Sequence, residues 1–287
     1  MFRMPANQDG WSLRNPSNGS DHSDILERVF MKTDSVTFQS QGRVGVITLN
    51  RPESRNAVNR QVTAELAEIR RHAGYGSELS VILLTGAGSG VFSIGTDDQE
   101  NIGRTDPEGE LAALKAAAII GSFDQPVIAA VNGDAFGQGL ELILACDVRI
   151  ASRNARFAMD QILKNRIPWD GGTQRLSRLV GRAKALEMIL SGMILDADQA
   201  LDIGLINRAA PPGEVLPPAM KIAEEMAGKG PIALRYAKEA ILRGMDMTLE
   251  QGFRLEADLY FLLHTTRDRT EGITAFREKR PPRFEGR

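Results

Sequence analysis

The sequence is poor in the side chains that form disulfides and metal centres. It has one cysteine, Cys146, and three histidines, His22, His72 and His264, which are far apart in the chain. A single cysteine excludes an internal disulfide and fits a reducing compartment. Because Cys146 follows the apolar run at residues 142–145, we interpret it as a core residue. No H-E-x-x-H pattern joins the histidines, so the sequence predicts no metal site.

An excess of charge of one sign and a long hydrophobic run are also missing. The chain carries 35 Lys and Arg against 37 Asp and Glu, a formal net charge of −2, whereas nucleic-acid-binding proteins usually show a basic excess. No stretch approaches the roughly 18 successive apolar residues of a membrane span. Residues 1–34 contain no apolar signal-peptide core. We therefore expect a cytoplasmic protein with a loose leader, no nucleic-acid partner and no membrane partner.

Motifs for nucleotide binding and serine hydrolysis are absent as well. The glycine-rich segment at residues 86–90 follows a predicted strand but lacks the G-x-G-x-x-G spacing. Val91 and Phe92 come next instead of a helix start, so a bound pyrophosphate would lack a helix dipole. There is no P-loop and no G-x-S-x-G elbow. The sequence therefore argues against a Rossmann-type or P-loop protein.

Hydrophobic periodicity predicts alternating strands and helices in the first two thirds of the chain. Strand-like runs at residues 35–39 and 44–49, separated by residues 40–43, predict a hairpin. Further strands are expected at residues 81–85, 126–131 and 148–151, and helices at residues 60–73, 108–123 and 138–145. Continuous apolar strands joined by helices are typical of a mainly parallel sheet.

From residue 171 onward the pattern is almost entirely helical. Thr248 and Gln251 form a capping box, and the helix they open has an apolar face of Leu249, Phe253, Ala257, Tyr260 and Phe261. A last charged helix is expected at residues 267–279. We therefore divide the chain into a leader (1–34), an α/β core with the active site (35–210) and a helical region (211–287).

Two glycine-containing turns are the strongest candidates for a functional site. Residues 92–97 follow one predicted strand, and residues 131–141 follow the next. Glycine lets backbone N–H groups approach a ligand closely, and two such turns side by side could direct two N–H groups at one oxygen. That arrangement is an oxyanion hole. The alternative is two ordinary turns between packed elements.

Several motifs, in order, resemble the crotonase (enoyl-CoA hydratase/isomerase) superfamily. They are residues 47–53 (ITLNRPE) with 56–57, residues 92–97 (FSIGTD), residues 132–147, residue 157 with 172–176 (GTQRL), and residues 267–281. The resemblance implies an α/β fold, the ClpP/crotonase spiral of β-β-α units, with a C-terminal helical trimerisation region. It also implies an enzyme that binds an acyl-CoA thioester and stabilises its enolate.

Position by position, the resemblance assigns the two oxyanion donors to the backbone N–H groups of Thr96 and Gln138. Glu141 matches the first hydratase glutamate, and Gln161 stands where the second is usual. Glutamine cannot exchange a proton near neutral pH, so another acid must act or the reaction is not hydration. Asp170 lies in a turn where several relatives place a catalytic aspartate. The alternatives are that Asp160 acts instead, or that Asp170 only caps the helix that follows.

The resemblance further implies a set of residues that contact the acyl group or coenzyme A. They are Ser54, Arg55, Ala57, Ile94, Thr96, Asp97, Asp98, Leu140, Gln161, Trp169, Phe276 and Lys279, with Lys279 reaching the phosphates of a neighbouring subunit's ligand. No permanent cofactor is expected, since coenzyme A is part of the substrate. The expected assembly is a homotrimer or a hexamer. The polar segment at residues 97–107 is expected to become ordered when coenzyme A binds.

Three functions stay open at this point. The first is a CoA-thioester lyase or isomerase that uses Glu141 and Asp170. The second is a hydrolase of C–C bonds in β-diketones that shares the fold without using coenzyme A. The third is a pseudo-enzyme that only binds acyl-CoA. The sequence does not specify the acyl chain, and it does not separate hydration from isomerisation or C–C cleavage.

Overall fold

The computed structural model describes residues 30–74, 77–98 and 113–287. Residues 1–29 of the expected leader lie outside the described residues. So do most of the polar segment at residues 97–107 and the first residues of the helix expected at 108–123. Within the described ranges, no helix is long and apolar enough to cross a lipid bilayer.

The predicted hairpin is confirmed. It consists of β2 (Val36–Gln41) and β3 (Val44–Leu49), which pair antiparallel. Gly42 in the turn has a φ of +57°, a left-handed conformation that glycine adopts without strain. An additional strand, β1 (Phe30–Lys32), pairs with β2, although the sequence analysis had placed it in the leader.

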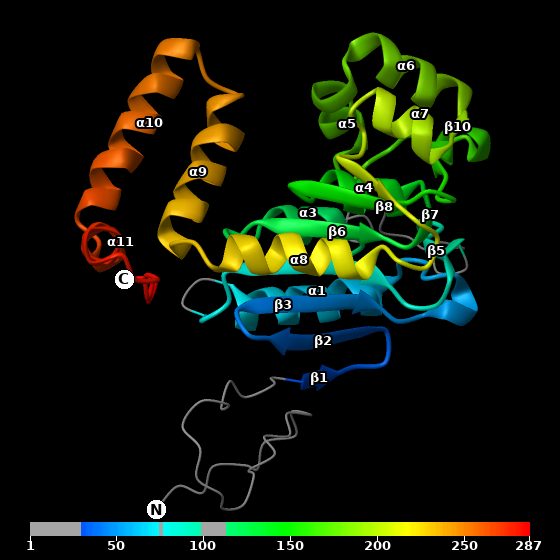
Figure 1. The fold of residues 1–287 in the computed structure, drawn as a ribbon. Helices are drawn as coiled ribbons and strands as arrows, with labels where there is room; N and C mark the ends of the chain where they lie inside the picture. Colours follow the sequence, from blue (N-terminus) through cyan, green and yellow to red (C-terminus); the bar gives the residue numbers. More distant parts are fainter. Residues whose placement is uncertain (1–29, 75–76, 99–112) are drawn as a thin grey trace, which may run out of the picture.

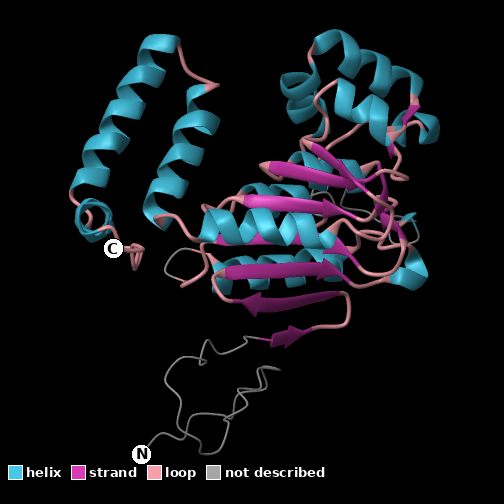
Figure 2. Ribbon diagram, in the orientation of Figure 1, coloured by secondary structure: helices cyan, strands magenta, loops and turns pink. Residues whose placement is uncertain are grey.

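The main sheet has seven strands in the order β1-β2-β3-β4-β6-β8-β11. Its parallel part contains β4 (Val81–Gly86), β6 (Val127–Val131), β8 (Val148–Ser152) and β11 (Arg208–Ala210). Successive side chains of a strand point to opposite faces. Ile82 and Leu84 accordingly join the core on the side of α1, and Val81 and Leu83 join the core beneath α8. Helices therefore cover both faces of the sheet (Figures 1 and 2), as the buried strands predicted.

A second, smaller sheet was not predicted. Its order is β10-β9-β7-β5, with β5 (Gly90–Ser93), β7 (Gly133–Phe136), β9 (Phe157–Ala158) and β10 (Ile194–Leu195). From the sequence, the segments of β5 and β7 are expected to be glycine turns, and β9 and β10 are too short to give a signal. β5 closely follows β4 of the main sheet, and β7 closely follows β6. The small sheet therefore brings the two candidate glycine turns side by side.

The helices around the core begin and end close to the expected residues, with one exception. α1 (Arg60–Ala73) is capped by the Asn59 side chain, which accepts a hydrogen bond from the Val62 N–H. α4 (Gln138–Leu144) begins directly after the β7 turn. In place of the long helix expected at residues 108–123, the described residues contain only the short α3 (Ala116–Gly121). Residues 113–115 just before it form a turn.

The C-terminal third is helical, as expected. Three short helices lie near the small sheet, one helix covers the main sheet, and a helical hairpin with a last helix stands apart. They are α5 (Gly172–Val180), α6 (Arg182–Ser191), α7 (Ala197–Asp202), α8 (Leu216–Ala227), α9 (Pro231–Gly244), α10 (Leu249–His264) and α11 (Arg267–Glu278). The capping box of Thr248 and Gln251 at the start of α10 is confirmed. Figure 1 shows α9 and α10 at one side of the molecule and the small sheet at the other.

Candidate active site

A cavity of about 620 Å³ opens where the ends of β5 and β7 meet the short 3-10 helix η3 (Asp160–Lys164). Its lining consists of Ile94, Gly95, Thr96, Asp98, Leu114, Gly137, Gln138, Asp160, Gln161, Lys164, Asn165, Arg166, Ile167 and Trp169. The sequence-predicted residues Ile94, Thr96, Asp98, Gln138, Gln161 and Trp169 are therefore brought together here. We call this space the acyl cavity, after the group that the family resemblance leads us to expect there.

Gly95 lets the turn after β5 lie directly against the start of α4. Its φ of +98° belongs to the left-handed region, and a Cβ atom there would lie 3.0 Å from the Phe136 carbonyl oxygen and 3.1 Å from the Gln138 nitrogen. Any larger residue would push the two turns apart. Glycine at this position thus fixes the spacing between Thr96 and Gln138.

The backbone N–H groups of Thr96 and Gln138 are both available as donors. Val58 and Thr96 form an isolated parallel β-bridge. In it, the Val58 N–H donates to the Gly95 carbonyl at 2.7 Å and the Asp97 N–H donates to the Val58 carbonyl at 2.8 Å, so the Thr96 N–H takes no part in the bridge. Gln138 is the first residue of α4, where N–H groups have no partner inside the helix. Among the residues that the structure describes, neither N–H donates to a protein acceptor.

The Gln138 side chain connects the two walls of the cavity. Its Oε1 accepts a hydrogen bond from the Thr96 hydroxyl at 2.9 Å, and its Nε2 donates to the Leu114 carbonyl and, at 3.2 Å, to Asp170 Oδ2. The residue is buried. The amide side chain therefore has its own partners and does not compete for the backbone N–H of Gln138.

Glu141 lies in the first turn of α4 and is fully buried. Its Oε1 accepts hydrogen bonds from the backbone N–H groups of Asp170 and Gly172, both at 2.8 Å, and its Oε2 accepts one from Gln161 Nε2 at 3.2 Å. Burial raises the pKa of Glu141 to about 7, although the two backbone N–H groups act in the opposite direction. The carboxyl group therefore holds its proton at a higher pH than an exposed glutamate does.

The Asp170 carboxylate is directed at α3. Its Oδ2 accepts the Ala117 N–H at 2.6 Å, and its Oδ1 accepts the Ala118 N–H at 3.0 Å. Burial raises the pKa of Asp170, and these hydrogen bonds oppose the rise. The alternative that Asp170 caps the following helix is wrong, because α5 begins at Gly172 with Gly171 as its N-cap and has no side-chain cap. Asp170 instead caps a helix more than 50 residues earlier in the chain, across the site.

The resemblance implies catalytic roles for Glu141 and Asp170, from which we would expect both carboxylates to face the cavity, but neither residue lines it. Gln161 and Gln138 line the cavity, and each donates a side-chain hydrogen bond to a carboxylate behind it, Gln161 to Glu141 and Gln138 to Asp170. The reason is that buried N–H groups need acceptors: those of Asp170 and Gly172 bond Glu141, and those of α3 bond Asp170. Both carboxylates therefore point into the protein. Gln161 is 8% exposed, and its Oε1 has no donor among the described residues.

The predicted binding residues at positions 54–57 lie next to the Thr96 turn. The Ile94 N–H bonds the carbonyl of Arg55, a residue with a left-handed φ of +52°, at 3.2 Å. Ser54 ends the short 3-10 helix η1 (Pro52–Ser54), and the carbonyl of the buried Ala57 accepts from the Arg51 guanidinium at 2.8 Å. That guanidinium also pairs with Asp97 at 3.0 Å. The segment and the turn are thus linked through backbone and side-chain bonds.

Three other predicted binding residues lie away from the cavity. Leu140 is fully buried in the main core. Phe276, in α11, is 85% exposed, and Lys279 ends that helix in a left-handed conformation. α11 lies at the opposite side of the molecule from β5 in Figure 1. Within one chain, the structure does not bring Phe276 and Lys279 to the acyl cavity.

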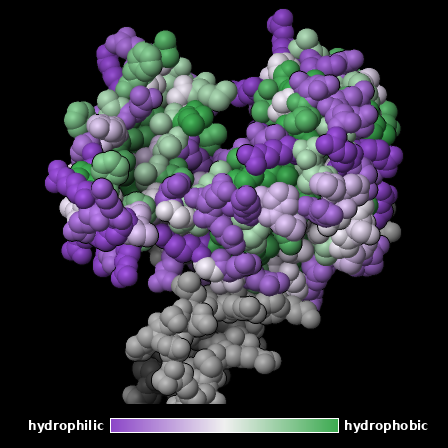
Figure 3. Space-filling model, in the orientation of Figure 1, coloured by the Kyte–Doolittle hydropathy of each residue, from purple (hydrophilic) through white to green (hydrophobic). Residues whose placement is uncertain are grey.

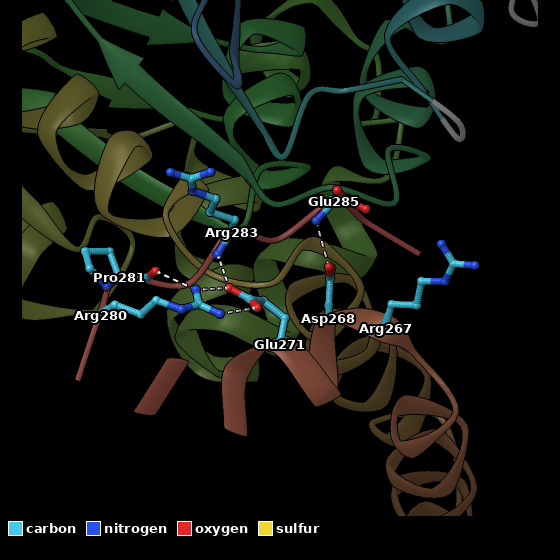
Figure 4. Close-up of a pocket in the computed structure, with 7 residues that line it drawn as sticks. All are labelled: Arg267, Asp268, Glu271, Arg280, Pro281, Arg283 and Glu285. Carbon is cyan, nitrogen blue, oxygen red and sulfur yellow. Dashed lines mark hydrogen bonds and ion pairs between the residues drawn. The ribbon is translucent and has the colours of Figure 1, made fainter. Parts of the chain in front are cut away.

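A second hollow, of about 640 Å³, lies beside α11 (Figure 4). Arg280 bonds both oxygens of Glu271, which holds the pKa of Glu271 down to about 2. Asp268 accepts the backbone N–H groups of Glu285 and Gly286 at 2.7 and 2.9 Å. These bonds attach the C-terminal tail to α11. Both acidic groups are occupied by structural partners, so we do not place the active site here.

Sequence reasoning missed several residues of the acyl cavity. Leu114, Lys164, Asn165, Arg166 and Ile167 line it. Lys164 and Arg166 both pair with Asp98 at 2.6 Å. Their sequence neighbourhood gave no signal, because η3 is a single irregular turn whose side-chain directions follow no periodicity. Among the described residues, no cluster of three His, Cys, Asp or Glu side chains could hold a metal ion.

Comparison with known proteins gives a consistent result. The family model for enoyl-CoA hydratase/isomerase matches residues 39–287. The 2,3-dehydroadipyl-CoA hydratase of Escherichia coli is 40% identical over 253 residues, covering 86% of this chain and 97% of that protein. The short-chain-enoyl-CoA hydratase of Clostridium acetobutylicum is 37% identical over 253 residues, covering 87% and 97%. The crystal structure of an enoyl-CoA hydratase from Bacillus anthracis matches with a TM-score of 0.85 and 36% identity, covering 88% and 100%.

The fold is therefore that of the crotonase superfamily, as the sequence motifs indicated. Within that superfamily, the chain belongs to the enoyl-CoA hydratase/isomerase family. Members of this family act on CoA thioesters and use no permanently bound cofactor; coenzyme A enters as part of the substrate.

Proposed function

We propose that this protein is an acyl-CoA hydratase or isomerase that works through a thioester enolate held in an oxyanion hole. The observation that carries the proposal is the pair of unused backbone N–H groups at Thr96 and Gln138, on two turns that Gly95 holds in contact at the acyl cavity. Two preset donors in a water-poor site stabilise a developing oxyanion by about 3 kcal/mol each.

Glu141 is the proposed acid–base group behind the cavity. Removal of a proton from the α-carbon, or attack at the β-carbon, moves negative charge onto the thioester oxygen. A group with a pKa of about 7 can both take and give a proton near neutral pH. Gln161 cannot exchange a proton, but its buried amide oxygen lacks a donor, so it can accept a hydrogen bond from a substrate water.

The remaining predicted contacts are proposed as the binding surface for coenzyme A and the acyl group. Ser54, Arg55 and Ala57 lie beside the Thr96 turn and are suited to the thioester end. Trp169 and Ile94 line the cavity and are suited to the acyl chain. Phe276 and Lys279 can contribute only from a neighbouring subunit, which requires the proposed trimer or hexamer.

Asp170 is proposed as a positioning residue, since its carboxylate is occupied by α3. We keep the cytoplasm as the proposed location, since the single cysteine is buried and unpaired.

The two alternative functions remain testable. A β-diketone hydrolase of this fold would not need coenzyme A, and a pseudo-enzyme would bind acyl-CoA without turnover. The relatives named above act on different acyl groups, a short chain in one case and dehydroadipyl in another. Their names therefore do not select an acyl chain for this protein.

Thermal unfolding with acetoacetyl-CoA tests the proposal. A ligand that binds only the folded state raises the melting temperature. We expect a rise with acetoacetyl-CoA and none with acetylacetone, followed by turnover of one member of a panel of enoyl-CoA thioesters. Stabilisation by acetylacetone alone would favour the hydrolase. Stabilisation by the thioester without any turnover would favour the pseudo-enzyme.

A further inference from the structure

Neither Glu141 nor Asp170 lines the acyl cavity, and Asp98, which does line it, is paired with Lys164 and Arg166. Glu141 is fully buried behind Gln161, and Asp170 is occupied by the N–H groups of α3. Gln161, which stands at the position of the usual second acid, is an amide. Proton transfer to or from a bound substrate needs a group within hydrogen-bond reach of it, directly or through one water; Glu141 could act only through a water, so a group that acts directly is still missing.

Asp160 is a carboxylate in the right place. It is the first residue of η3 and lines the acyl cavity beside Gln161. A Cβ atom built on Gly137 would lie 2.9 Å from Asp160 Oδ1, so the carboxylate lies directly against the backbone of Gly137. Gly137 immediately precedes Gln138, whose N–H is the proposed oxyanion donor. Asp160 therefore lies close to the Gln138 N–H, where the thioester oxygen is proposed to bind.

The Asp160 side chain is half-buried, and no other described residue donates a hydrogen bond to it. Asp160 differs in this from Asp98, which forms ion pairs with Lys164 and Arg166, and from Asp97, which forms an ion pair with Arg51. Burial raises the pKa of Asp160; the nearby charge of Lys164 opposes the rise and that of Asp98 adds to it. Apart from its own backbone N–H, the Asp160 carboxylate has no hydrogen-bond donor among the described residues, so it is able to change its protonation state during a reaction.

We propose that Asp160 is the cavity-side proton-transfer residue of this enzyme and takes the place of the second acid that Gln161 cannot supply. The inference rests on the proposed function. In the step it performs, the α-carbon C–H bond breaks and its proton forms an O–H bond on Asp160. The electron pair moves through the carbonyl carbon to the thioester oxygen, which the Thr96 and Gln138 N–H groups hold. Return of the proton to carbon restores the Asp160 carboxylate.

Charge conservation makes this arrangement favourable. As the enolate forms, one negative charge leaves Asp160 and one appears on the thioester oxygen, so two negative charges never stand side by side. A carboxylate that stayed ionised next to Gly137 would repel the enolate. In the proposed step Asp160 is neutral at the moment the oxyanion exists.

The test uses the full-length protein, a panel of saturated and unsaturated acyl-CoA thioesters, and two readouts. These are turnover as a function of pH, and deuterium incorporation from D₂O at the α-carbon. Asp160→Asn keeps the size of the side chain and removes the carboxylate that accepts the proton, so both rates should fall by about 10²-fold or more. The pH profile should lose one ionisation, and Asp160→Glu should recover part of the rate. Asp202→Asn, at an exposed aspartate of α7, is the matched control and should behave as wild type.

Each outcome is decisive. An Asp160→Asn variant within about threefold of wild type, with an unchanged pH profile, would overturn the inference while leaving the proposed function standing. A loss of rate with an unchanged pH profile and no recovery in Asp160→Glu would also overturn it, because a structural role predicts that pattern. A wild-type protein that neither turns over nor exchanges any thioester would overturn the proposed function, and this inference with it.

Discussion

At the residue scale, the position of Gln138 at the start of a helix allows the role of its backbone N–H to be tested separately from that of its side chain. Proline is well tolerated at the first position of a helix, because its missing N–H would have no intrahelical partner there. Gln138 occupies that position in α4. Substitution with proline therefore removes the proposed oxyanion donor without breaking the helix.

We predict that Gln138→Pro lowers turnover by about 10²–10³ relative to Gln138→Ala. Both variants lose the side-chain bonds to Thr96, Leu114 and Asp170, so their difference reports the backbone N–H alone. The measurement is the rate at saturating thioester below both melting temperatures. Equal rates in the two variants would mean that the N–H of Gln138 does not hold the oxyanion.

Glu141 should make the stability of the protein depend on pH. Its folded-state pKa of about 7 is raised above the ordinary value of 4.5, so the folded state retains a proton that the unfolded state has lost. That contribution to stability is fully present below pH 4.5 and is lost as pH rises to 7.

Glu141→Gln removes this titration and keeps an oxygen for the N–H groups of Asp170 and Gly172. We predict that the variant gains stability relative to wild type between pH 4.5 and 7, by on the order of 3 kcal/mol at 1.36 kcal/mol per pKa unit. It should at the same time lose turnover by about 10²-fold or more. Urea unfolding at several pH values measures the first effect. A difference in unfolding free energy that stays constant over this range would show that Glu141 has an ordinary pKa.

The sequence predicted which residues belong to the site better than it predicted the direction of their side chains. Thr96, Gln138, Gln161 and Trp169 line the cavity as expected. The direction of the Glu141 and Asp170 carboxylates was not predictable, because it depends on N–H groups that are distant in sequence. Motif spacing identifies a position in the chain but gives no information on which donors surround it.

At the scale of elements, Asp170 joins two parts of the chain that are far apart. Its two oxygens each accept an N–H from the first turn of α3, at 2.6 and 3.0 Å. α3 is short and begins without a side-chain cap of its own. The Asp170 carboxylate therefore replaces a local cap and keeps α3, with Leu114 just before it, against the acyl cavity.

We predict that Asp170→Asn destabilises the protein by about 1–3 kcal/mol, because an amide NH₂ would face one of the two N–H groups and leave it without an acceptor. The melting temperature measures this cost. Below it, turnover should keep the wild-type pH dependence, since Asp170 is proposed to position and not to transfer protons. A lost ionisation in the pH profile would instead restore Asp170 as a catalytic acid.

The main sheet, α1, α4 and the capping box of α10 were predictable because their signals are local. Each depends on hydrophobic periodicity or on a cap within a few residues. The small sheet was not predictable. Its strands have two to four residues, and they pair only because the main sheet has already brought β5 next to β7. Strand pairing that depends on tertiary structure gives no periodic pattern to read.

At the scale of the whole molecule, the hairpin of α9 and α10 presents apolar surface that one chain leaves exposed. On α10, Leu249, Phe253, Tyr260, Phe261 and Leu262 are between 51% and 74% exposed, and only Leu259 is buried. The face expected from the sequence is therefore present and uncovered within one chain. Large exposed apolar patches mark interaction sites.

The hairpin also borders a hollow of about 500 Å³ between α9 and α5. Apolar side chains of α9, Leu234, Ile241 and Leu242, face this hollow together with Leu179 of α5. Figure 3 shows the hollow as a notch between two lobes with hydrophobic side chains on both. We propose a second copy of the chain as the occupant of this hollow.

We predict that the protein forms a trimer or a hexamer at micromolar concentration, with the α10 face buried between subunits. Phe253→Glu and Phe261→Glu together place two charges in that face, where unpaired charges are costly. The double variant should be a monomer by light scattering, with much reduced affinity for acyl-CoA if Phe276 and Lys279 act across subunits. Leu216→Glu, at an exposed apolar position on α8, is the control and should keep the wild-type mass. A wild-type protein that is monomeric at this concentration would contradict the prediction, and Phe276 and Lys279 would then have no route to the site.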